Sequence, residues 1–131
     1  MIRDKIKKYS LDEGHNCAES MLLAANEEYG LGLSESEIEL MRGFGGGMGA
    51  GTTCGAISGS VAALSKLICT KVDKDTAHEV TGGFIAEFEK RFSHSRCDVL
   101  TPIYKKEDVR CYELLLAVAD LLDETIAKYK V

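Results

Sequence analysis

The chain lacks any excess of basic side chains, since 16 Lys and Arg stand against 21 Asp and Glu, for a formal net charge of -5. Proteins that bind nucleic acid or anionic membranes usually carry a basic patch, so this balance argues against both kinds of partner. No stretch approaches the roughly 18 consecutive apolar residues of a membrane-spanning helix, which argues against membrane insertion. Charges lie throughout the first nine residues, unlike a secretory signal. We therefore expect a cytoplasmic protein, in a compartment that keeps ordinary thiols reduced.

The sequence also lacks the pattern of half-buried β-strands, because no run of four or more residues alternates apolar and polar side chains. Outside one glycine-rich stretch, apolar residues recur instead at spacings of three and four. Apolar residues make up 45% of the 131, which is enough to bury a core. These features predict an all-α fold, a single compact bundle of about five main helices that occupies residues 1–131.

Apolar stripes and capping residues indicate where these helices lie. A short stripe covers residues 2–9, and a second covers 18–29 and stops at Gly30. Ser34 and Glu37 have the spacing of a capping box and predict a short third helix. Residues 54–69 carry one charge, Lys66, so this helix is expected at the buried centre. Stripes over 77–92, capped by Asp73 or Asp75, and over 112–129 predict the last two helices, with a polar segment around Pro102 between them.

Eight of the 13 glycines lie between Gly43 and Gly59. No Gly-x-Gly start in this stretch has glycine at the sixth position, no strand precedes it, and no Gly-Lys-Ser/Thr follows, so neither nucleotide-binding fingerprint is present. An anion site at the following helix N-terminus stays open as a weaker hypothesis. The favoured interpretation is a structural frame in which Gly55 and Gly59, four residues apart, let another helix approach Cys54 closely.

Four of the five cysteines lie at or near expected helix starts. They are Cys17 after Asn16, Cys54 after Thr52 and Thr53, Cys97 in a turn after Arg96, and Cys111 after Asp108 and Arg110. The partial positive charge of a helix N-terminus favours the thiolate, which is both the nucleophile and the metal ligand. The two arginines could add to this effect. Cys69 ends the most apolar helix and is expected to be a buried hydrophobic residue without a role.

The cysteine spacing excludes the compact zinc and thioredoxin-type motifs, because no Cys-x-x-Cys occurs. The gaps are 37 residues (17 to 54), 43 (54 to 97) and 14 (97 to 111). A site assembled from four distant helix ends stays open, as do all three disulfide pairings of four cysteines. His15 and His94 lie near cysteines and are candidate proton carriers or ligands, although a solvated surface role is the more common one.

The order of the cysteines resembles a known family. A cysteine near the N-terminus, in Asn16-Cys17-Ala18, is followed by Cys54-Gly55-Ala56-Ile57-Ser58-Gly59 and then by Cys97 and Cys111. This order is similar to that of the small redox-active proteins named for their C, GCAxxG, C, C signature, over nearly the whole chain. The resemblance implies four signature cysteines with a redox role and leaves Cys69 outside the signature. The family in turn resembles an iron–sulfur domain of certain multihaem-type proteins, but the chain has no Cys-x-x-Cys-His motif for haem.

The sequence thus predicts a cysteine-based redox or electron-transfer protein. Its candidate catalytic residues, and equally its candidate metal ligands, are Cys17, Cys54, Cys97 and Cys111; Gly55 and Gly59 are the candidate cofactor-binding residues. In a thiol form, similar to a thiol–disulfide oxidoreductase, Cys54 is the expected attacking thiolate and a second cysteine resolves it. In a metal form, three or four thiolates hold an iron–sulfur cluster or zinc. The alternative is a non-catalytic helical binding module of a transport or metabolic complex. The redox partner is not identified by the sequence, and a homo-oligomer is compatible with it.

Overall fold

The computed structural model describes residues 1–129, and within this range the chain forms seven α-helices and no β-strand. The all-α prediction is confirmed, with four long helices and three short ones in place of five main helices. The helices are α1 (Arg3–Lys7), α2 (Cys17–Tyr29), α3 (Glu35–Glu39), α4 (Gly55–Leu67), α5 (Lys74–Phe92), α6 (Cys97–Tyr104) and α7 (Tyr112–Tyr129). Within residues 1–129, no helix is both long and apolar enough to cross a membrane.

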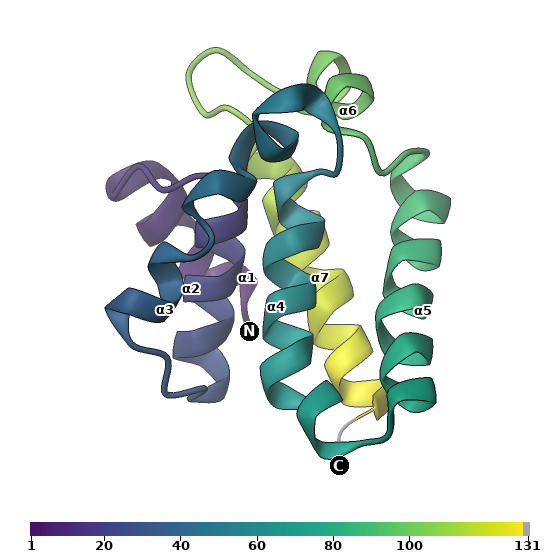
Figure 1. Ribbon diagram of the computed structural model, residues 1–131. Coiled ribbons are helices and arrows are strands. Elements are labelled where there is room, and N and C mark those ends of the chain that lie inside the picture. The colour runs from purple at the N-terminus through teal and green to yellow at the C-terminus, as the bar shows by residue number, and fades with distance from the viewer. Residues whose placement is uncertain (130–131) are drawn as a thin grey trace.

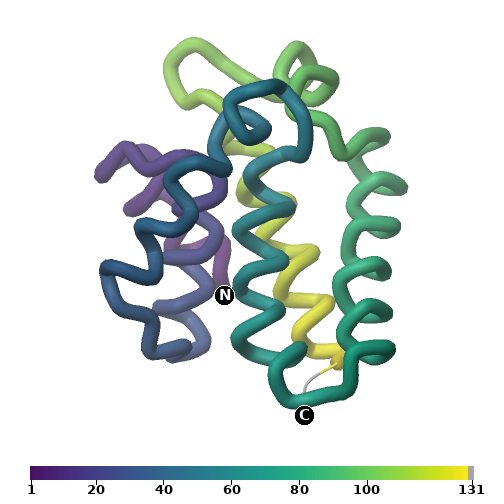
Figure 2. Tube along the Cα trace, in the orientation of Figure 1, coloured from purple at the N-terminus to yellow at the C-terminus, as the bar shows by residue number. Residues whose placement is uncertain are grey.

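Helix α4 lies at the centre of the bundle, as its apolar sequence predicts. It packs most extensively against α2 on one side and also contacts α5 and α7 (Figure 1). Its Ala56, Ile57 and Leu64 are at most 2% exposed, so the helix is buried on several faces. The connections before α4 and on both sides of α6 gather at one end of the bundle, and the turn between α4 and α5 lies at the other end (Figure 2).

Local side-chain caps begin three of the helices where the sequence indicates. Asn16 and Glu19 form a reciprocal capping box at the start of α2, as Ser34 and Glu37 do at α3. Asp73 accepts a hydrogen bond from the backbone N–H of Thr76 and caps α5. These bonds satisfy backbone N–H groups that have no partner within the helix, and they fix the entry of each chain segment.

The approach of α2 to α4 depends on two glycines, which confirms the expectation for Gly55 and Gly59. A Cβ added at Gly59 would lie 2.3 Å from the carbonyl oxygen of Ala18 and 2.9 Å from the Cβ of Met21. A Cβ at Gly55 would lie 3.1 Å from the Cβ of Cys17. Any side chain at Gly59 would therefore push the two helices apart, and with them the cysteines at their starts.

Helix α6 is where the structure departs most from the expected fold. The segment around Pro102 is helical, with Leu100 buried and Pro102 inside the helix. Proline lacks one donor, but an eight-residue helix held at its start by an external bond tolerates this loss. That bond runs from the backbone N–H of Cys97 to the carbonyl oxygen of Thr52, 2.5 Å away. The anchor is contributed by a residue 45 positions earlier (97 minus 52), so local sequence patterns do not indicate it.

Candidate functional site

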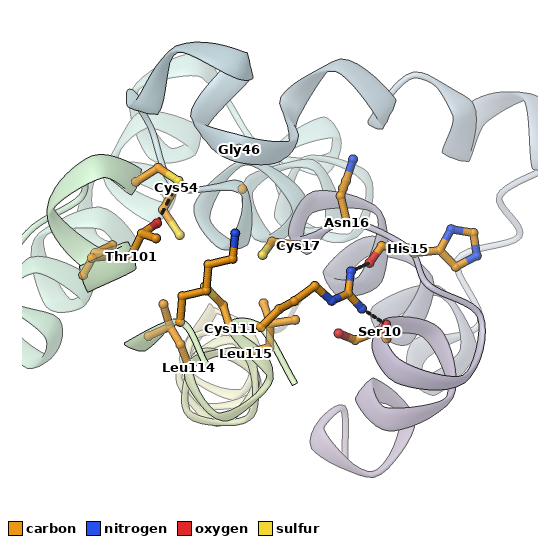
Figure 3. Close-up of a pocket in the computed structure, with 15 residues that line it drawn as sticks. Ser10, His15, Asn16, Cys17, Gly46, Cys54, Thr101, Cys111, Leu114 and Leu115 are labelled. Atoms are coloured by element: carbon orange, nitrogen blue, oxygen red, sulfur yellow. Dashed lines mark hydrogen bonds between the residues drawn. The ribbon is translucent and has the colours of Figure 1, made fainter. Parts of the chain in front are cut away.

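The four signature cysteines line one cavity of about 170 Å³ at the end of the bundle where α2, α4, α6 and α7 begin. Figure 3 shows Cys17, Cys54 and Cys111 around this space, together with Thr101, Leu114 and Leu115. Cys97 also lines it, whereas Cys69 does not. All five cysteines are free thiols. The structure therefore brings the four cysteines, which lie at distant helix starts, to one cavity.

Cys17 is the first residue of α2, and the Asn16–Glu19 capping box fixes its position. The Asn16 amide also donates a hydrogen bond to the carbonyl oxygen of Arg42, 3.0 Å away, at the start of the glycine-rich stretch. A Cβ at Gly45 would lie 2.6 Å from that same amide nitrogen. The glycine stretch thus closes over the start of α2, which supports its role as a frame.

Cys54 occupies the N-cap position of α4 itself, so neither Thr52 nor Thr53 caps this helix. The hydroxyl of Thr52 instead donates to the carbonyl oxygen of Gly47, 2.8 Å away, and closes the glycine loop. The backbone N–H of Cys54 donates to the carbonyl oxygen of Ser95 at 2.9 Å. This bond joins the start of α4 to the segment that leads into α6.

Cys97 is the first residue of α6, and its sulfur lies 3.5 Å from the hydroxyl oxygen of Thr101, one turn later. A Cβ at Gly47, whose φ is +62°, would lie 2.7 Å from the Cβ of Cys97. Glycine is required there both for the left-handed backbone and for space. The glycine-rich loop therefore brings the start of α6 against the start of α4.

Cys111 lies directly before α7, at the end of a tight loop. Backbone hydrogen bonds of 2.7 and 2.8 Å join Lys106 and Arg110 in both directions. Arg110 adopts a φ of 56°, an unfavourable region for a residue with a Cβ. Its guanidinium donates to the carbonyl oxygens of Ser10 and His15, drawn as dashed lines in Figure 3. Arg110 thus connects the Cys111 loop to the segment that precedes Cys17.

Cys17 and Cys111 line the same cavity, and their thiols shift each other's pKa in opposite directions. Hydrogen bonding from the Cys17 thiol lowers the pKa of Cys111 to about 7 against the opposing effect of burial, and the charges of Lys105 and Arg110 lower it further. The same hydrogen bonding, together with burial, raises the pKa of Cys17 far above the ordinary range. Near pH 7 Cys111 therefore begins to lose its proton, while Cys17 keeps its own.

Cys54 is only 5% exposed, and burial raises its pKa to about 11. The backbone N–H groups of Ala56 and Ile57 act in the opposite direction on this pKa, but they do not offset burial. This raised pKa argues against the expectation that Cys54 is the attacking thiolate. Of the two thiols, Cys111 is the one whose pKa is lowered.

The charged side chains of the cavity are all basic, in a protein whose net charge is -5. Lys105 and Arg110 line it, and within the described part of the chain no Asp or Glu does. The other arginine that precedes a cysteine behaves differently. Arg96 is bound to the carboxylate of Asp98 at 2.9 and 3.0 Å and does not line the cavity. Of the two arginines singled out in the sequence, only Arg110 reaches the site.

The structure also places the other residues that the sequence analysis names as candidates. His15 lines the cavity, but its imidazole points away from the cysteines (Figure 3) and lies 3.2 Å from a carboxylate oxygen of Glu13. His94 is exposed and does not line the cavity. Gly55 lines it, but Gly59 packs under Ala18 and does not, so its assignment to a cofactor is not supported. Cys69 is half-buried, not fully buried as expected, because it begins a single turn after α4 ends.

The side-chain geometry does not fit the expected metal site. A structural zinc or an iron–sulfur cluster needs three or four converging ligands. Within residues 1–129, no three His, Cys, Asp or Glu side chains come close enough together to hold a metal ion. The cysteines share a cavity without forming a set of converging ligands.

The sequence of the chain matches one family model, described as "Putative redox-active protein (C_GCAxxG_C_C)", over residues 15–125. The chain belongs to this family. The matched range contains all four cysteines that line the cavity and covers most of the 131 residues. No curated protein and no solved structure gives a significant match. The family description agrees with the redox role that the sequence predicts and specifies no cofactor, substrate or partner.

Proposed function

We propose that this family member is a dithiol–disulfide redox protein in which Cys111 is the attacking thiolate and Cys17 is the resolving thiol. The observation that carries the proposal is that Cys17 and Cys111 line the same cavity, where the Cys17 thiol lowers the pKa of Cys111. A thiolate beside a protonated thiol is the arrangement that two-step disulfide exchange requires. The family's description as redox-active supports the same chemistry.

The exchange proceeds in two steps. The Cys111 thiolate attacks one sulfur of a substrate disulfide, forms a mixed disulfide with it, and displaces the other half as a thiolate. That thiolate takes the proton of Cys17, whose sulfur then attacks Cys111 and displaces the first half. The protein loses two electrons and gains a Cys17–Cys111 disulfide, and the substrate disulfide becomes two thiols, one of them ionised. Exchange with a reducing dithiol reverses the sequence.

The surroundings of the pair support this assignment of roles. Cys111 is more accessible than Cys54, and Lys105 and Arg110 stabilise its charge. Leu114 and Leu115 are at most 2% exposed and make the floor of the cavity apolar. An apolar floor excludes water and strengthens the interaction between the basic groups and the thiolate. In a helical binding module whose cysteines only pack, there would be no reason for four of them to line one cavity.

A thiol count tests the proposal. The protein is purified under argon, its iron and zinc are measured, and free thiols are counted before and after treatment with bis(2-hydroxyethyl) disulfide. We expect a reversible loss of two thiols in the unmodified protein and in Cys69→Ser, which serves as the matched control. We expect no such loss in Cys111→Ser. Five unreactive thiols, or iron or zinc in stoichiometric amount on the cysteines, would contradict the dithiol mechanism.

A further inference from the structure

The cavity differs in charge from the rest of the molecule. The protein as a whole carries a net charge of -5, whereas the charged side chains that line the cavity are Lys105 and Arg110. Even with Cys111 as a thiolate, this wall keeps a net positive charge. The nearest carboxylate on α6, that of Asp98, is occupied by Arg96. The local field at the cavity is therefore opposite in sign to that of the whole surface.

The two basic groups hold different positions. Lys105 ends α6 and is exposed, so its ammonium is free to meet a ligand at the mouth. Arg110 is half-buried in the wall, fixed by the carbonyl oxygens of Ser10 and His15. Both charges act on the sulfur of Cys111. A negatively charged group on a reactant would therefore be drawn toward the attacking sulfur.

The volume of the cavity limits the size of the reactant. About 170 Å³ is below the roughly 300–1,000 Å³ of sites that enclose drug-sized ligands. Such a space accepts one arm of a small disulfide above the apolar floor of Leu114 and Leu115. The chemistry of the lining thus favours a short apolar arm that ends in an anion.

We propose that the disulfide which oxidises the Cys17–Cys111 pair is a low-molecular-weight, carboxylate-bearing disulfide, selected by Lys105 at the mouth of the cavity and Arg110 in its wall. This inference rests on the proposed dithiol function. It adds the class of substrate to that function. The carboxylate of the substrate lies against the basic groups, and its S–S bond lies next to the sulfur of Cys111. The electron balance is that of the exchange above, with two carboxylate-bearing thiols as products.

Three disulfides of similar length test the selection: 3,3′-dithiodipropionate (anionic), bis(2-hydroxyethyl) disulfide (neutral) and cystamine (cationic). The rate of Cys17–Cys111 disulfide formation is measured for each by acid quench, alkylation and mass spectrometry. At low salt we expect the anionic disulfide to react at least ~10-fold faster than the cationic one, and the ratio to fall in 1 M NaCl. The overall charge of the protein alone would produce the opposite order.

Two variants locate the source of the preference, with each rate divided by that of the neutral disulfide in the same variant. Lys105→Gln should reduce the anionic preference several-fold. Lys90→Gln makes the same change in net charge at an exposed position of α5 that does not line the cavity. It should leave the preference unchanged. Equal rates for the three disulfides, or a faster reaction with cystamine, would overturn the proposed selectivity and leave the dithiol function intact. Failure of all three to form the Cys17–Cys111 bond would overturn both.

Discussion

The two sides of the cavity place the same residue type at helix starts, yet give the thiols different properties. On one side Cys111 is half-buried beside Lys105 and Arg110 and shares a hydrogen bond with Cys17, and its pKa falls to about 7. On the other side Cys54 receives two backbone N–H groups of α4, and its pKa rises to about 11 because it is buried. Position at a helix N-terminus therefore does not by itself set the pKa of a thiol.

Typical free energies explain why the pKa values of Cys54 and Cys111 differ. A helix N-terminus stabilises a negative charge by about 0.3–1 kcal/mol, which is less than the ~1.4 kcal/mol of one pKa unit. Burial of a thiolate costs more than this, since full burial shifts pKa values by up to about 3–5 units. At Cys54 the helix is opposed by nearly complete burial. At Cys111 partial burial is outweighed by a hydrogen bond and two cationic neighbours.

The largest expected effect is the difference in alkylation between the two sides. At pH 7 a thiol of pKa about 7 is roughly half ionised, and one of pKa about 11 is ionised to about one part in ten thousand. The higher nucleophilicity of the more basic thiolate recovers part of this ratio. We expect iodoacetamide to modify Cys111 about 100-fold faster than Cys54, measured by peptide mass spectrometry over time. Faster modification of Cys54 would reverse the comparison.

The next effect concerns the spacing of α2 and α4, the helices that begin at Cys17 and directly after Cys54. Gly59→Ala places a methyl group against the Ala18 carbonyl, so we expect a loss of about 1–3 kcal/mol in the free energy of unfolding in urea. Gly82→Ala is the matched control at an exposed position of α5, where an added Cβ meets no atom within 4 Å. It should stabilise the protein by up to about 1 kcal/mol. Equal effects of the two substitutions would show that the close approach of the helices is unimportant.

A smaller change is expected when the thiol that supports Cys111 is removed. Without the Cys17 donor the thiolate loses its main stabilisation, so the pKa of Cys111 should rise toward that of an ordinary thiol. The pH profile of Cys111 alkylation, which increases as the thiolate forms, should then move to higher pH. At pH 7 the rate in Cys17→Ala should fall about threefold or more. Cys17→Ser keeps a donor and should retain part of the low pKa, whereas identical profiles for Ala and Ser would contradict this explanation.

Arg110 offers a test of the loop that presents Cys111. Substitution by Ala or Gly removes the guanidinium in both cases, but only Gly also relieves the strain of a φ of 56°. We expect Arg110→Gly to be more stable than Arg110→Ala by about 1 kcal/mol in urea unfolding. Both should close the Cys17–Cys111 disulfide more slowly than the unmodified protein. Equal stability of the two variants would mean that the loop does not hold this backbone conformation.

The smallest effect is expected at Cys69, which does not line the cavity. Its sulfur is 3.9 Å from the carbonyl oxygen of Ala77, a weak contact that serine can replace. Cys69→Ser should change the free energy of unfolding by less than ~1 kcal/mol and leave the alkylation rate of Cys111 unaltered. An altered rate at Cys111 would show that the two regions are coupled.

Sequence patterns predict those parts of the molecule that depend on neighbouring residues. The capping box Ser34–Glu37, the helix start expected at Asn16 and Cys17 and the apolar stripe of α4 are local signals, and the structure confirms the two helix starts and the central position of α4. The motif Cys54–Gly59 and the order of the cysteines indicate the family.

Features that depend on distant contacts could not be predicted in this way. Arg110 bonds to the Ser10 carbonyl, 100 residues away, and α6 is anchored by Thr52. The proposed choice of Cys111 as nucleophile depends on the burial of Cys54 and on the effect of Cys17 on Cys111, which only the folded chain supplies. No motif in the sequence includes Lys105, and only the structure shows that it lines the cavity.

The most direct test of the central claim is to identify the first disulfide that forms under mild oxidation. The protein is exposed to a limiting amount of bis(2-hydroxyethyl) disulfide, its remaining thiols are blocked with iodoacetamide, and peptides are mapped without reduction. Our interpretation predicts a Cys17–Cys111 linkage, with Cys54, Cys69 and Cys97 alkylated. A first linkage between Cys54 and Cys97, or between either of them and Cys111, would contradict it.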